Sequence, residues 1–120
     1  MADRLLFIGW GTPVRGREER ALEVFNESVG LYGRMQQDGR IESFDITLLS
    51  PNASLNGHAQ LKGTAAQIAA VQEDQEFVRT IADASLIVED LTVIRGYANE
   101  GVATQMGIYA EAIAKVSQLA

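Results

Sequence analysis

The apolar run RLLFIGW at residues 4–10 constrains the fold of this chain more than any other stretch. Its length, with Gly9 and Gly11 at its end, favours a strand over a helix. Both alternating sets of side chains are apolar, with Leu5 and Phe7 on one side and Leu6, Ile8 and Trp10 on the other. A strand that is apolar on both faces needs cover on both faces. The second face is covered either by a second subunit or by the chain's own last helix, and we favour the subunit.

Two further runs alternate between apolar and polar residues, with turn-forming residues between them. RIESFDITLLS spans residues 40–50 and SLNGHAQLKG spans residues 54–63. Together they predict an antiparallel hairpin with a loop from Pro51 to Ser54. The register that pairs the two apolar sets places Phe44 opposite Leu61, Ile46 opposite Ala59 and Leu48 opposite Gly57.

The same register gathers the polar side chains of the hairpin on the other face of the sheet. It sets Asp45 opposite Gln60 and Thr47 opposite His58, with Lys62 beyond. His58 is the chain's only histidine, and an imidazole titrates near physiological pH. His58 is therefore the candidate general base, with Asp45 and Gln60 to orient it and Thr47 beside it. The interpretation that we favour at this position is a sheet histidine that is hydrogen-bonded across the hairpin inside a subunit interface.

Two positions outside the hairpin complete the candidate ligand-binding site. Trp10 ends the first strand, where its ring either walls an apolar pocket or caps the core. Glu89 and Asp90 interrupt an otherwise apolar stretch, and two consecutive acids cannot both point into the core. One of them therefore faces water or a site, and we count Glu89 with the ligand-binding residues.

Apolar residues at three- and four-residue spacing predict helices over residues 17–39, 63–85 and 99–119. The first helix is expected to place Phe25 under the sheet, and the second to kink or break around residues 72–75, where its phase slips. The run LIVEDLTVI at residues 86–94 is predicted as the fourth strand.

This order of elements is that of a ferredoxin-like βαββαβ plait. It predicts an α+β fold with a four-stranded antiparallel sheet, two helices on one face and a C-terminal helix. The absence of a linker or repeat predicts a single domain over residues 1–120.

Composition argues against several classes of function. Ten Lys and Arg against sixteen Asp and Glu give a net charge of -6, whereas a nucleic-acid partner needs a basic stripe. The chain has no cysteine, which removes thiolate nucleophiles and cysteine-bound metals. With one histidine, a metal site would depend on carboxylates such as Asp45 and Glu89, so we predict neither metal nor cofactor. MADRLLFIGW is neither a signal peptide nor a membrane span, which predicts a cytoplasmic protein without a membrane partner.

The stretch GREERALEVFNESVGLYGRMQQDGRIESFDITLL, followed by LNGHAQLKGTAAQIAAV, resembles small stand-alone proteins of the dimeric α/β-barrel superfamily. The likeness covers roughly residues 4–95 and is greatest to members without assigned activity, with YCII-related proteins as distant relatives. It implies a homodimer whose two sheets pair face to face around a barrel. Such barrels bind small, often aromatic or apolar, ligands in the lumen or in side pockets, and relatives include cofactor-free monooxygenases.

The resemblance and the residues together predict a homodimer, joined through the sheet face, that binds a small organic ligand. If the protein is an enzyme, we expect cofactor-free proton transfer or oxygenation with His58 as base. The alternative is a non-catalytic module that binds a metabolite or a protein partner, in which the same residues only hold the dimer together.

Overall fold

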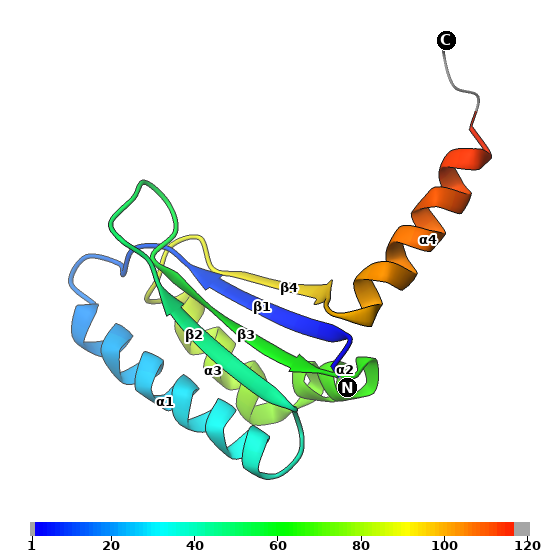
Figure 1. Ribbon diagram of the computed structural model, residues 1–120. Helices are drawn as coiled ribbons and strands as arrows, with labels where there is room; N and C mark the ends of the chain where they lie inside the picture. The colour runs from blue at the N-terminus through cyan, green and yellow to red at the C-terminus, as the bar shows by residue number, and fades with distance from the viewer. Residues whose placement is uncertain (1, 117–120) are drawn as a thin grey trace.

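The computed structural model describes residues 2–116 and contains one four-stranded antiparallel sheet with helices against one face (Figure 1). The strands are β1 (Arg4–Trp10), β2 (Ser43–Leu48), β3 (Gly57–Gly63) and β4 (Thr92–Tyr97). The helices are α1 (Glu18–Gln37), α2 (Ala65–Glu73), α3 (Gln75–Ser85) and α4 (Glu100–Ala114). The strand order β2-β3-β1-β4 confirms the predicted ferredoxin-like α+β plait.

The hairpin register predicted from the alternating pattern is confirmed. On one face Phe44 pairs with Leu61, Ile46 with Ala59 and Leu48 with Gly57, and on the other Asp45 pairs with Gln60 and Thr47 with His58. Asn52 shapes the connecting loop, because its side-chain oxygen accepts hydrogen bonds from the backbone N–H groups of Ser54 and Leu55.

The core lies between the sheet and the helices α1, α2 and α3, which all lie on one side of the sheet (Figure 1). Its largest fully buried side chains are Leu6, Leu31, Met35, Ile41, Leu61 and Ile68. Phe25, predicted to lie under the sheet, faces Trp10 of β1 but is only half-buried. Val24 takes the buried position, and the next residue points about 100° away around the helix. Leu48, predicted on the helix-covered side, is 69% exposed near the end of the edge strand β2.

The second predicted helix is in fact two helices, as the slip in its apolar pattern indicated. α2 begins at a capping box, in which the Thr64 hydroxyl accepts from the Gln67 N–H at 3.2 Å and the Gln67 side chain accepts from the Thr64 N–H at 2.8 Å. The chain becomes extended at Asp74, with ψ of 128°, and α3 starts at the following residue.

The fourth strand begins later than the predicted range of residues 86–94. Leu86 is the C-cap of α3, and the segment after it bonds to the loop that follows β1, with Glu89 N–H to the Thr12 carbonyl at 2.9 Å. Asp90 then takes a positive φ of 56°, and β4 starts at Thr92. The pattern failed here because a short apolar run looks the same in a strand and in a buried connection.

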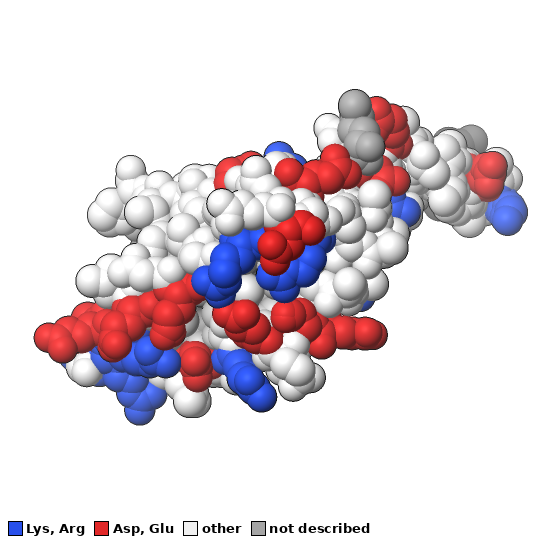
Figure 2. All heavy atoms as spheres, turned by 90° about the horizontal axis from the view of Figure 1, so that it is seen from below, with Lys and Arg blue, Asp and Glu red and all other residues white. Residues whose placement is uncertain are grey.

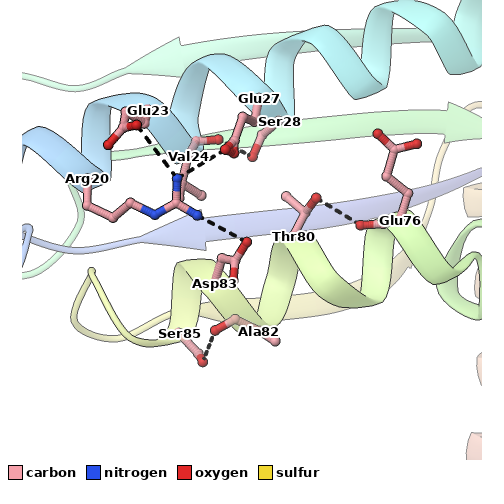
Figure 3. Close-up of polar contacts among 10 residues, drawn as sticks. All are labelled: Arg20, Glu23, Val24, Glu27, Ser28, Glu76, Thr80, Ala82, Asp83 and Ser85. Atoms are coloured by element: carbon pink, nitrogen blue, oxygen red, sulfur yellow. Dashed lines mark hydrogen bonds and ion pairs between the residues drawn. The ribbon is translucent and has the colours of Figure 1, made fainter.

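Ion pairs align α1 and α3 on the outer surface of the helix layer. The Arg20 guanidinium lies between the two helices and donates to Glu27 at 3.1 Å and to Asp83 at 3.3 Å (Figure 3). The hydrogen bond with Glu27 raises the pKa of Arg20. Figure 2 shows acidic and basic side chains intermingled over this face of the molecule. Such exposed pairs add little to stability, and their contribution here is to set the alignment of the helices.

The last helix, α4, does not pack beside the other three. It rises from the end of the sheet, away from the layer of α1, α2 and α3 (Figure 1). From Val102 to Val116 every side chain except that of Gln105 is exposed. Within residues 2–116, therefore, no element covers the second face of the sheet. None of the described helices is long and apolar enough to cross a membrane.

Candidate functional site

An apolar cavity of about 340 Å³ opens between the sheet and the helices α1 and α3. Its walls come from four parts of the chain: the ends of β1 and β2, the first half of α1, the start of β3 with the residue before it, and the stretch from α3 to Leu91. The wall residues on which the argument below depends are Trp10, Phe25, Ile46, Ile81 and Ala84. A cavity of this size and character suits a small organic molecule.

The Trp10 side chain borders this cavity and also packs against the core. Its ring meets the Phe25 ring edge-on, with centroids 6.1 Å apart and planes at 68°. Gly57, the partner of Trp10 across the sheet, makes room for the indole, since a Cβ at that glycine would lie 2.9 Å from the ring. Phe25 is only half-buried because its ring borders the cavity instead of filling the core.

Polar groups around the cavity are few, and most have partners within the chain. The Ser28 hydroxyl donates to the Val24 carbonyl at 2.7 Å, and one carboxylate oxygen of Glu18 accepts from the Gly16 N–H at 2.9 Å. Burial raises the pKa of Tyr32 to about 12, against a smaller lowering by its hydrogen bond with Ser28, so its phenol is neutral at ordinary pH. The cavity can therefore bind an apolar molecule, but it holds no paired acid and base among the described residues.

His58 lies on the opposite face of the sheet, which we call the open face. Its ring stacks on Phe7 with centroids 5.1 Å apart and a tilt of 33°. Its Nδ1 atom is buried and has no hydrogen-bond partner within the described part of the chain. Asp45, predicted to orient His58, instead pairs with Lys62, with 3.4 Å between the carboxylate oxygen and Nζ.

The predicted site residues thus divide between two places. Asp45, Thr47, His58 and Gln60 share the open face, as the register predicted. Trp10 lies on the helix side, so it does not line one cavity with His58 in the single chain. Glu89 is exposed in the connection before β4 and does not border the apolar cavity. Asp90, beside it, is also exposed.

Sequence reasoning missed the wall that α3 and the connection after it contribute to the cavity. Ile81, Ala84 and Leu91 are apolar residues of kinds found in any core, and nothing in their spacing distinguishes a cavity wall from a packed interior. Only the placement of α3 against α1 brings them opposite Trp10. Within residues 2–116 no group of histidine and carboxylate side chains lies close enough together to hold a metal ion.

No protein-family model and no curated protein matches the sequence. The fold does match solved structures, and these matches confirm the ferredoxin-like fold. A dimeric protein of unknown function with a ferredoxin-like fold from Bacteroides fragilis superposes with a TM-score of 0.59 at 12% identity, covering 79% of this chain and 96% of that chain. A protein of the ethyl tert-butyl ether D (EthD) family from Bacillus halodurans gives a TM-score of 0.63 at 14% identity, covering 81% and 99%.

A cofactor-independent oxygenase from Streptomyces nogalater is a third match, with a TM-score of 0.50 and 16% identity over 82% of this chain and 93% of that chain. At these identities the comparisons establish the fold of this chain and leave its function to be argued from its own residues.

Proposed function

We propose that this protein binds a small apolar organic molecule in the cavity beside Trp10, and that it does so as a homodimer joined through the open face of the sheet. The observation that supports ligand binding is the cavity itself, which has a volume of about 340 Å³ and is walled mostly by apolar side chains. Aromatic rings supply much of the wall, which suits a flat or aromatic ligand. The ligand is held by burial of apolar surface, with Asn56 and Thr80 as polar groups at the wall.

The shape and composition of the open face support the dimer. Phe7 lies flat over Gly9 and Leu5 lies over Gly96, because a Cβ at these glycines would be 2.6 Å and 3.2 Å from the respective side chains. Ile94, the partner of Phe7 on β4, is 56% exposed beside them. Leu5, Phe7 and Ile94 thus form an apolar patch on this face, and an exposed apolar patch is typical of an interface. The fold match described as dimeric, from Bacteroides fragilis, agrees with this assignment.

A matched pair of variants on α3 tests the ligand cavity. Ala84 borders the cavity, whereas Ala82 on the same helix is exposed and does not. We expect 2-naphthol to bind the parent protein, to raise its melting temperature, and to bind Ala84→Phe at least tenfold more weakly, because the new ring occupies the cavity. Ala82→Phe should bind like the parent. Calorimetry checks this, and equal affinity in both variants, or no binding to the parent at millimolar probe, contradicts the proposal.

A second candidate function is cofactor-free proton transfer or oxygenation at His58. It is favoured by the buried Nδ1 atom of His58, which no described residue satisfies and which is therefore available to a substrate or to a group of the second subunit. Asp45, Thr47 and Gln60 would act there as neighbours on the open face. In the dimer this face becomes the lumen between two sheets, where water is excluded and a weak base is more effective.

A further inference from the structure

The helix α4 has the mostly apolar surface of a buried helix, but it does not pack against the other helices of its own chain. Three of its polar residues, Glu100, Thr104 and Glu111, follow one narrow stripe together with Gly107, while Gln105 lies outside it. The large apolar side chains lie on the remaining surface, and those of Val102, Met106, Ile108 and Tyr109 are 48%, 57%, 53% and 60% exposed. A helix with so wide an apolar surface belongs in the interior of a protein or an assembly.

The direction of α4 is fixed at its base. The Asn99 side chain donates to the Ala2 carbonyl at 2.6 Å, and the Ala98 N–H donates to the Asp3 carbonyl at 3.1 Å. Gly101 in the first turn packs directly on Asp3, because a Cβ at this position would lie 2.2 Å from the Asp3 carbonyl oxygen. These contacts fix the orientation of α4 relative to the sheet, so that the helix points away from the rest of the domain.

Length and direction identify what the helix can reach. α4 has 15 residues and is therefore about 22 Å long. It rises from the sheet on the side away from α1, α2 and α3, which is where a second sheet would stack on the open face at about 10 Å (Figure 1). The helix is long enough to pass the edge of that second sheet. An isolated helix of this length is marginal in water, so it also needs a surface to pack on.

We propose that α4 is a docking arm whose apolar surface packs along the flank of a second copy of this chain. This inference rests on the dimer of the proposed function and extends its interface from the open face onto the helix. In a two-fold dimer each subunit gives one arm and receives one, which covers the apolar surface of both helices at once. The narrow polar stripe of α4 then remains toward water.

Substitutions at the two glycines of α4 test the direction of the arm. Gly101→Ala forces a Cβ against the Asp3 backbone and should tilt the helix, whereas Gly107→Ala on the polar stripe meets nothing within 4 Å. We expect Gly101→Ala to raise the dimer dissociation constant at least tenfold in sedimentation velocity. Gly107→Ala should leave it unchanged or lower it, because alanine favours the helix. Equal dissociation constants for the two variants overturn the proposal.

A charge on the apolar surface tests the contact itself. Met106→Glu should weaken the dimer at least tenfold, whereas Leu86→Glu, at an equally exposed apolar position on the helix layer, should not. A parent that is monomeric at all concentrations overturns both the arm and the dimer. A dimeric parent that Met106→Glu does not weaken overturns the arm alone. Flotation of a monomeric parent with phosphatidylcholine vesicles would assign α4 to a lipid surface and also overturns the arm.

Discussion

Burial of a single side chain changes its acid–base chemistry, and Tyr32 on α1 shows this most directly. It is 3% exposed, and burial raises its pKa to about 12 against an ordinary value of 10. The folded protein therefore keeps a proton that the unfolded chain loses above pH 10. The contribution of Tyr32 to the free energy of unfolding is therefore fully present below pH 10, and it falls by about 2–3 kcal/mol as the pH rises through 12. Tyr32→Phe should flatten this alkaline loss in chemical denaturation at pH 9 to 12, and an unchanged slope contradicts the assignment.

His58 is the residue on which the second candidate function depends. If its imidazole is the base, His58→Ala should lower the rate of proton transfer by about 10²–10⁴-fold while leaving the dimer and the binding of 2-naphthol intact. Ser43→Ala, on the same face of β2 but opposite Lys62 and away from His58, is the matched control and should keep the activity. Deuterium exchange from solvent into small ketones, followed by NMR, measures the transfer. A His58→Ala protein with the exchange rate of the parent would remove His58 from any chemistry.

At the scale of elements, the sequence was informative wherever a pattern has one structural solution. The hairpin register followed from alternation alone, because a shift by one residue would expose Phe44, Ala59 and Leu61. The break between α2 and α3 followed from a slip in helical phase. The start of β4 could not be predicted from the pattern. The apolar residues at 87–88 belong to a connection that pairs with the loop after β1, and not to the strand itself. The position of α4 could not be predicted from the sequence either. The apolar surface of a helix indicates that the helix packs against something, but it does not identify the partner.

The candidate site was predictable only in part for the same reason. Register placed His58, Thr47, Asp45 and Gln60 together on one face, and the structure agrees. It could not place Trp10 relative to them, because the face to which each set belongs depends on where the helices pack. The ion pair of Asp45 with Lys62 could not be predicted either. Lys62 and His58 both lie on the polar side of the hairpin, and the alternating pattern does not show which of them Asp45 contacts.

At the scale of the whole molecule, two apolar surfaces remain uncovered in a chain that otherwise buries its core. One is the part of the open face formed by Phe7 on β1 and Ile94 on the edge strand β4, and the other is α4. In the proposed dimer a second copy would cover both surfaces at once and would convert the open face with His58 into an enclosed lumen. The ligand cavity beside Trp10 lies on the other side of the sheet, so each subunit keeps its own binding site in the dimer.

Sedimentation equilibrium of the full chain and of Ile94→Asp tests the sheet-face dimer most directly. Ile94 is 56% exposed on the open face, and Val78, 46% exposed on α3, provides the matched control. The parent and Val78→Asp should both be dimers at micromolar concentration. Ile94→Asp should be a folded monomer, because a charge within the apolar part of the interface cannot be buried without a partner. A parent that remains monomeric, or an Ile94→Asp protein that dimerises as tightly as the parent, would contradict this account of the molecule.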